Sequence, residues 1–185
     1  IVGFDVIFFT ILLSLGVITL SDELDRIIQI FVPAPDYIVD LVDLMKPEST
    51  IGFVLLFLAV GILAPLGEEV IFRGFLQKFL EEYWSDITKA VLVTSFFFSL
   101  IHMNPYWFVQ IYILGTILGY LSWKTNSIIP PLVLHGLNNT IAIMLTLYGS
   151  NEHTFYLWNG HVSPWIIGVA VIFTFLGFFY ISKVK

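Results

Sequence analysis

Cysteine is absent from the 185 residues of this chain. Its absence excludes disulfide bonds, thiolate metal sites and catalysis by a cysteine nucleophile. Charge is also scarce: Asp, Glu, Lys and Arg make up 12% of the sequence, whereas soluble domains carry about 25%. The basic residues number 8 against 14 acidic ones, so the chain lacks the positive charge that nucleic-acid binding requires.

The sequence consists largely of long apolar runs, and hydrophobic residues make up 58% of it. A helix needs about 20 predominantly apolar residues to cross a bilayer. Six runs approach or exceed this length: Phe4–Leu20, Thr50–Lys78, Thr88–His102, Tyr106–Trp123, Ile128–Tyr148 and Pro164–Ser182. We therefore predict an all-α, polytopic membrane helix bundle with about six transmembrane helices. Residues 1–185 are expected to form a single integral membrane domain.

The intervals between the runs carry most of the charge. Ser21–Ser49 holds prolines and acidic residues among apolar residues at helical spacing, which predicts amphipathic helices at the membrane interface. Gly149–Ser163 is predicted to be a loop. Lysines lie in the connections on the opposite side, including Lys124, Lys183 and Lys185. By the positive-inside rule, they place both termini in the cytoplasm, as parts of a multi-pass protein of the cell membrane.

Two glutamates interrupt the second apolar run. Glu68 and Glu69 follow a charge-free stretch, and Arg73 lies four residues after Glu69, on the same face of a helix. A charge at membrane depth costs about 3 kcal/mol or more, so these residues are functional candidates. Pro65 and Gly67 are expected to weaken the helix just before the glutamates, so that this run crosses the membrane as a broken helix.

Two histidines are expected at a depth similar to that of the glutamates. His102 and His135 each lie inside an otherwise uncharged run. At about 1.5 Å per helical residue, Glu68, His102 and His135 lie roughly 15–20 Å from the predicted cytoplasmic ends. Asn139 follows His135 by four residues, and Phe98 precedes His102 by the same spacing, so each pair shares a helix face.

These groups favour hydrolysis of a substrate by an activated water molecule. Burial makes a glutamate a stronger base, so Glu68 is the candidate general base, and His102 could share the proton. His135 and Asn139 could donate hydrogen bonds to a developing oxyanion. No Gly-x-Ser-x-Gly sequence is present, so a serine nucleophile has no support.

Glu69 and Arg73 are predicted to form an ion pair that supports the site. A zinc site is the alternative, because Glu68, His102 and His135 could supply three ligands. The sequence has no His-Glu-x-x-His motif, however, and the charge of Arg73 would oppose a cation. We therefore expect neither a metal nor a cofactor.

The order of these groups resembles that of a known family. Three motifs carry the likeness: Glu68-Glu69-x-x-x-Arg73, Phe98-x-x-x-His102 and His135-x-x-x-Asn139. They are similar to the motifs of the CPBP family of CAAX proteases and bacteriocin-processing enzymes, also called the Abi family, which includes the Rce1-like glutamic intramembrane proteases. The likeness covers about residues 60–142, which we take as the expected catalytic core.

The resemblance implies a metal-independent endopeptidase. By position, Glu68 corresponds to the water-activating glutamate of the family, assisted by His102, and the pair His135 and Asn139 corresponds to its oxyanion hole. The best-known substrates of the family are prenylated CAAX proteins. The implied partners are therefore the lipid bilayer and a peptide or protein substrate, prenylated or otherwise membrane-associated. A chain of this kind is expected in a prokaryote.

Three other functions stay open on the sequence. A non-catalytic membrane partner, such as a bacteriocin self-immunity protein, could keep the same residues for binding. A proton- or ion-coupled transporter could use the buried acids and histidines, although it would be expected to have inverted repeats, and the sequence has no clear internal repeat. A zinc-dependent membrane protease is the alternative among the hydrolases.

Overall fold

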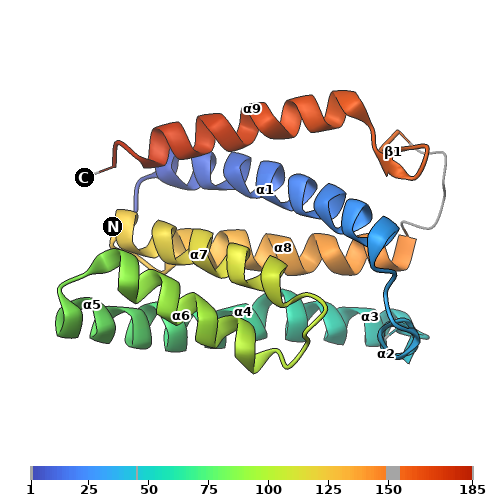
Figure 1. The fold of residues 1–185 in the computed structure, drawn as a ribbon, viewed down its shortest axis with the longest axis horizontal. Coiled ribbons are helices and arrows are strands. Elements are labelled where there is room, and N and C mark those ends of the chain that lie inside the picture. Colours follow the sequence, from blue (N-terminus) through green and yellow to red (C-terminus); the bar gives the residue numbers. More distant parts are fainter. Residues whose placement is uncertain (1, 45, 149–154, 185) are drawn as a thin grey trace.

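The computed structural model describes residues 2–44, 46–148 and 155–184, which are almost entirely helical (Figure 1). The α-helices are α1 (Phe4–Phe31), α2 (Asp36–Leu44), α3 (Thr50–Leu56), α4 (Ala64–Glu69), α5 (Lys78–Trp84), α6 (Ile87–Ile101), α7 (Phe108–Thr125), α8 (Ile129–Tyr148) and α9 (Pro164–Ile181). Two π-helical segments, η1 (Phe57–Leu63) and η2 (Val70–Gln77), join α3 to α4 and α4 to α5. Two short strands, β1 (Leu157–Trp158) and β2 (His161–Val162), precede α9.

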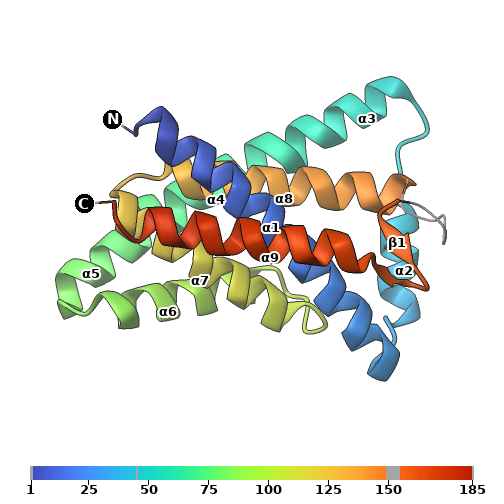
Figure 2. The same ribbon diagram turned by 90° about the horizontal axis from the view of Figure 1, so that it is seen from above.

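The long helices lie side by side in layers (Figure 1). α1 packs most extensively against α9, and the two cross at an angle (Figure 2). α7 and α8 lie between this pair and the helices α3 to α6 (Figure 1). α8 contacts α1 on one side and η1 on the other, and α7 contacts α6. The buried apolar core includes Phe72, Phe98, Leu118, Leu121 and Leu134.

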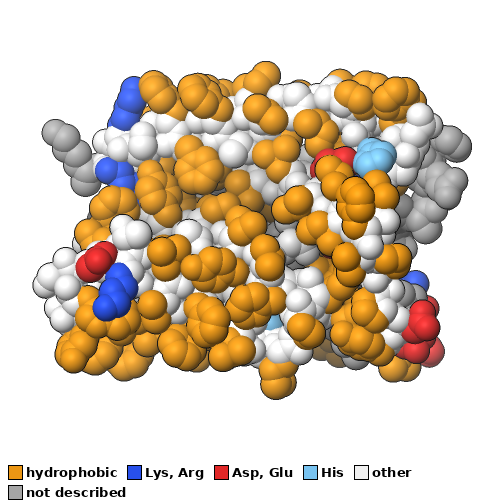
Figure 3. Space-filling view, viewed as in Figure 1, with side chains coloured by type: hydrophobic (Ala, Val, Ile, Leu, Met, Phe, Trp, Pro, Cys, Tyr) orange, Lys and Arg blue, Asp and Glu red, His pale blue; other side chains and the backbone are white. Residues whose placement is uncertain are grey.

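The predicted all-α membrane helix bundle is confirmed. Hydrophobic side chains cover most of the face in Figure 3, and charged side chains lie mainly toward the ends of the helices. Within the described residues, three helices are long and apolar enough to cross a membrane: α1, the continuous helix Thr50–Trp84, and α9. The chain is therefore a membrane protein. The count of six spans and the orientation of the termini stay predictions.

α1 is longer than the sequence analysis predicted. The first span was expected to end at Leu20, but the helix continues to Phe31. No glycine or proline lies between Leu20 and Pro33, and Arg26 pairs with Asp22 one turn earlier, with 3.0 Å between Nε and Oδ2. The helix ends just before Pro33, because a proline disfavours the α conformation in the residue that precedes it. Of the predicted amphipathic segments, α2 is therefore the separate helix.

The helix that carries the glutamates is not broken at Pro65 and Gly67, contrary to the sequence prediction. Its backbone stays helical over Thr50–Trp84, with a π-helical segment on each side of α4. If the π pattern continued, residue 65 would donate its N–H to the carbonyl of Val60, but proline has no N–H. Asn139 of α8 donates from Nδ2 to that carbonyl at 3.0 Å and so replaces the missing bond.

Asn139→Ala is expected to lower the free energy of unfolding by about 1–3 kcal/mol, because it leaves the Val60 carbonyl without a donor. Adding Pro65→Ala restores a backbone N–H at that point of the helix, so the double variant should regain much of the loss. Thermal unfolding of the wild type, the two single variants and the double variant measures the coupling. If the stability changes of the two single variants simply add in the double variant, this account of the π segment is contradicted.

Gly115 and Gly119 allow α7 to pack closely inside the bundle. A Cβ atom on Gly119 would lie 2.9 Å from Val91 Cγ1 and 2.9 Å from Gln77 Oε1. The carbonyls of the two glycines accept hydrogen bonds from Arg73 Nη2 and Gln77 Nε2, each at 3.0 Å. The four-residue spacing of the glycines thus matches the spacing of the two side chains that bind them, and it serves packing within one chain.

Gly119→Val is expected to destabilise the protein by about 1–3 kcal/mol, because the new side chain overpacks the contact with α6 and η2. Gly168→Val in α9 is the matched control, since Gly168 is exposed and a Cβ atom there meets nothing within 4 Å. The midpoint temperatures of unfolding of the two variants give the comparison. Equal losses in both would mean that valine itself, rather than the close approach, is responsible.

The segment Gly149–Ser163, predicted to be a loop, contains a β-hairpin. β1 pairs with β2 in an antiparallel arrangement. Glu23 of α1 holds the hairpin: it accepts a hydrogen bond from the Val162 N–H at 2.7 Å and lies 2.8 Å from Nδ1 of His161. His153 of this segment lies outside the described residues.

Candidate active site

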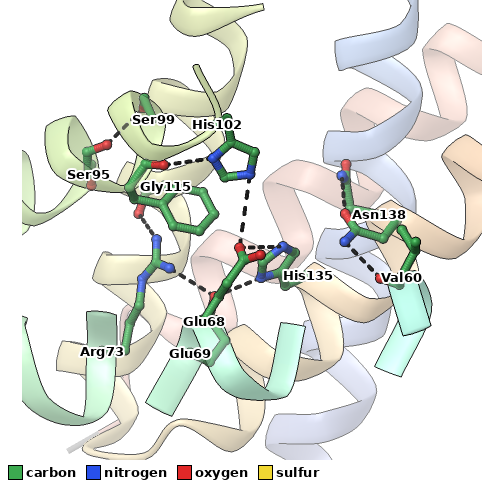
Figure 4. Close-up of polar contacts among 12 residues, drawn as sticks. Val60, Glu68, Glu69, Arg73, Ser95, Ser99, His102, Gly115, His135 and Asn138 are labelled. Carbon is green, nitrogen blue, oxygen red and sulfur yellow. Dashed lines mark hydrogen bonds and ion pairs between the residues drawn. The ribbon is translucent and has the colours of Figure 1, made fainter. Parts of the chain in front are cut away.

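Three helices bring the predicted polar residues to one place (Figure 4). The continuous helix through α4 and η2 carries Glu68, Glu69 and Arg73, His102 is the C-cap residue that follows α6, and α8 carries His135. α4 contacts α8, and η2 contacts both α6 and α7. Residues that are far apart in the sequence therefore meet inside the bundle.

Glu69 lies at the centre of a buried network. Its Oε1 atom accepts a hydrogen bond from Arg73 Nη1 at 2.8 Å and lies 2.8 Å from His135 Nδ1. Arg73 also donates from Nη2 to the carbonyl of Gly115. The side chains of Glu69 and Arg73 are 0% exposed. The predicted ion pair is therefore present and completely buried, and removing one partner of such a pair costs about 3–5 kcal/mol.

Glu68 is the accessible glutamate of the two, with a side chain that is 25% exposed. Its Oε2 atom lies 3.7 Å from Nε2 of His135 and 3.9 Å from Nε2 of His102. Both separations exceed the length of a direct hydrogen bond. Glu68 Oε2 is also buried and has no hydrogen-bond partner in the described part of the chain. One carboxylate oxygen thus faces two imidazole nitrogens across a short gap.

The other ring nitrogen of each histidine is held by its own partner. Nδ1 of His102 lies 2.7 Å from the carbonyl oxygen of Phe98, which can only accept, so Nδ1 carries the proton. Nδ1 of His135 donates to the Glu69 carboxylate. Partners of this kind set the tautomer and the ring orientation of a histidine. Both rings are thereby oriented with Nε2 toward Glu68.

Phe98 connects these groups through its buried ring. Its centroid lies 4.9 Å from that of His102 and 5.5 Å from that of His135, both in edge contacts. The guanidinium carbon of Arg73 lies 4.3 Å from the same centroid. A cation over an aromatic ring contributes about 2 kcal/mol when both are desolvated. Phe98 therefore packs on His102 as predicted, and its contacts with Arg73 and His135 are additional.

Asn139 binds a different part of the helix that carries the glutamates. Besides donating to Val60, it accepts a hydrogen bond from Asn138 Nδ2 at 3.3 Å. Figure 4 shows Val60 and Asn138 to one side of the cluster formed by Glu68 and His135. The structure therefore places Asn139 on the same helix as His135, with its hydrogen bonds directed to Val60 and Asn138. Its role at an oxyanion stays a prediction.

Gln77 is a buried polar residue that the sequence analysis missed. Its Nε2 atom donates to the Gly119 carbonyl at 3.0 Å and to Glu81 Oε1 at 2.8 Å, while its Oε1 atom is buried without a partner in the described structure. The sequence contains a pattern that could have indicated Gln77. Gln77 follows Arg73 by four residues, which is the spacing between Gly115 and Gly119.

Glu68, His102 and His135 are the three residues that the sequence offered as zinc ligands. Zinc ligands lie about 2.0–2.2 Å from the metal. Among the described residues, no group of three or more histidine, cysteine, aspartate or glutamate side chains has an arrangement that could hold a metal ion. The positive charge of Arg73, one hydrogen bond from Glu69, would also repel a cation in this cluster.

Comparison with known proteins identifies two relatives, each similar over about half of the chain. An uncharacterized 24.3 kDa protein of Escherichia coli is 28% identical over 105 residues, which cover 55% of this chain and 48% of that protein. The UPF0177 protein YaiF of Lactococcus lactis subsp. lactis (strain IL1403) is 32% identical over 102 residues, 52% of this chain and 44% of that protein. The chain thus spans about half the length of these curated relatives. No solved structure matches it.

A family model supplies the classification. It is described as type II CAAX prenyl endopeptidase Rce1-like, and it matches residues 50–141, about half of the chain. The matched segment begins with α3 and extends into α8, so it contains Glu68, Glu69, Arg73, both histidines and Asn139. The chain therefore belongs to the Rce1-like family of type II CAAX prenyl endopeptidases.

Proposed function

We propose that this protein is an intramembrane endopeptidase that hydrolyses a peptide bond with water activated by Glu68. The family match supports a CAAX-type protease. The observation that carries the mechanism is the approach of two histidine Nε2 atoms to one Glu68 oxygen, at 3.7 and 3.9 Å. Residues 60–142 form the proposed catalytic core of a single domain that comprises residues 1–185.

Glu68 is the general base of the proposed reaction. Its carboxylate takes a proton from a water molecule while the water oxygen attacks the carbonyl carbon of the peptide bond. The C–N bond then breaks, and the same proton passes to the leaving amine, so that water is the one co-reactant and no cofactor takes part. Since Nδ1 of His102 donates to Phe98, its Nε2 atom is free to share that proton.

His135 stabilises the oxyanion in this mechanism. With both ring nitrogens protonated, it donates from Nε2 to the developing oxyanion, and the Glu69 carboxylate balances its charge through Nδ1. Loss of one donor of this kind lowers kcat by about 10²–10³-fold. Asn139 is the proposed second donor, and it has to release the Val60 carbonyl before it can reach an oxyanion.

The proposed substrate is a peptide or protein in the membrane that carries a prenyl group, which is the substrate class in the description of the family. The partial exposure of Glu68 supports access of such a peptide to the carboxylate. Similarity to proteins of Escherichia coli and Lactococcus lactis supports a prokaryotic cell membrane as the location. The distribution of lysines supports a multi-pass topology with both termini in the cytoplasm.

Peptide cleavage in liposomes tests this function. The purified protein is given a panel of fluorogenic CAAX-type peptides, prenylated and unprenylated, with and without a strong chelator. We expect at least one prenylated peptide to be cut, and the rate to persist in the chelator. A rate that disappears in the chelator and returns with added zinc would favour a zinc-dependent protease. Failure to cut any peptide would favour a non-catalytic membrane partner.

A further inference from the structure

Two adjoining cavities lie between α1, α7, α8 and α9. Their volumes are about 220 Å³ and about 370 Å³, and Ser21, Gln110, Leu114 and Asn138 line both of them. α7 and α9 contact each other only sparsely, which leaves this space between them. Small-molecule sites have volumes of about 300–1,000 Å³. None of the glutamates and histidines of the candidate active site lines either cavity.

The smaller cavity is mostly apolar. Val17 and Leu24 of α1, Ile113 and Ile117 of α7, and Phe178 of α9 contribute to its wall. An apolar space of this kind suits a hydrocarbon chain, because such a chain needs no hydrogen-bond partners. The head group of a ligand is therefore expected in the larger cavity.

The larger cavity has a negatively charged end. Asp22 and Asp25 of α1 line it together with Trp107. Asp22 is paired with Arg26. Asp25 instead accepts hydrogen bonds from two neutral donors, Trp107 Nε1 at 3.3 Å and the side-chain amide of Gln29. In the described part of the chain, the charge of Asp25 has no cationic partner.

We propose that the two cavities form one binding site for a single-chain amphiphile with a cationic ammonium head group. The ammonium lies at Asp25, whose carboxylate attracts a cation, next to Trp107, which donates its Nε1–H to that carboxylate. The chain extends past Leu114 toward Phe178. Asp22 and Asp25 repel a sulfate or phosphate head group, and an uncharged alcohol leaves Asp25 unpaired. The site goes beyond the proposed peptidase function, since the two share no lining residue.

Photoaffinity labelling tests this site. The probe is dodecylamine with a photoreactive diazirine in its chain, added to the protein in phosphatidylcholine nanodiscs, and mass spectrometry locates the labelled residues. We expect labels to concentrate near Val17 and Leu114, and unmodified dodecylamine to remove them at concentrations at which dodecanol and dodecyl sulfate do not. Equal competition by dodecanol would overturn the proposal. So would equal labelling of outward-facing residues such as Val169 and Phe175, which reports partition into the bilayer.

Labelling of substituted proteins distinguishes loss of the head-group contact from loss of folding. Asp25→Asn keeps the size of the side chain and removes its charge, so labelling should fall by about fivefold. Asp36→Asn, the same change at an exposed acid of α2, should label like the wild type. Leu114→Trp fills the space shared by the cavities and should also block labelling. Full labelling of Asp25→Asn would overturn the assignment, and labelling of Glu68→Gln should be unchanged whether or not the protein cuts peptides.

Discussion

Replacing Glu68 with glutamine is expected to lower kcat for peptide cleavage by about 10²–10⁴-fold, because glutamine keeps the shape of the side chain but cannot take a proton from water. KM should change much less, since the amide can still form hydrogen bonds with the substrate. Glu68 is 25% exposed, and its Oε2 atom has no hydrogen-bond partner within the described residues, so the variant should fold normally. Initial rates over a range of peptide concentrations give both constants.

Glu82→Gln provides the matched control for this experiment. It makes the same substitution on the same continuous helix, at an exposed position in α5, and it should keep the wild-type rate. Full activity in Glu68→Gln would rule out the proposed general base. If Glu69→Gln folded normally and lost activity while Glu68→Gln kept it, the roles of the two glutamates would have to be exchanged.

The polar residues of the candidate site could be predicted from the sequence because charge at membrane depth is costly and rare. Glu68, His102 and His135 stand out in long uncharged runs, and helical spacing placed them at similar depth. In the structure, the Nε2 atoms of both histidines lie within 4 Å of Glu68 Oε2. The pairing of Glu69 with Arg73 followed from the same spacing argument.

The conformation of the helix that carries the glutamates could not be predicted in the same way. The break expected from Pro65 and Gly67 was wrong, because a π segment shifts the hydrogen-bond pattern by one residue and another helix satisfies the carbonyl left free. That compensation depends on Asn139, which lies 79 residues from Val60 in the sequence. Apolar periodicity contains no information on such a distant partner.

The orientations of the two histidine rings could not be predicted from the sequence either. Spacing predicted contact between Phe98 and His102, but the bond that orients the imidazole uses the backbone carbonyl of Phe98, which every residue possesses. Likewise, the partner of His135 Nδ1 lies 66 residues earlier in the chain. Only the packing of α4 against α8 shows that Glu69 reaches this nitrogen and that His135 directs Nε2 to Glu68.

Arg73→Met is expected to lower the free energy of unfolding by about 3–5 kcal/mol, because the buried Glu69 charge would keep its hydrogen bond from His135 but lose its arginine partner. Methionine fills part of the same volume, so the lost charge accounts for most of the effect. The variant also loses the hydrogen bond to the Gly115 carbonyl and the contact with the Phe98 ring. Unfolding by denaturant, followed by tryptophan fluorescence in detergent, measures the change.

Arg26→Met is the matched control, since Arg26 pairs with Asp22 at 3.0 Å but the two side chains are 25% and 19% exposed. Loss of such a partly exposed pair should cost up to about 1 kcal/mol. Adding Glu69→Gln to Arg73→Met removes the uncompensated charge, and the double variant should regain part of the stability, because neutral replacements of a buried ion pair are often tolerated. If it regains none, the loss arises from the packing of Arg73 on Phe98, and the charge of Glu69 is not what Arg73 stabilises.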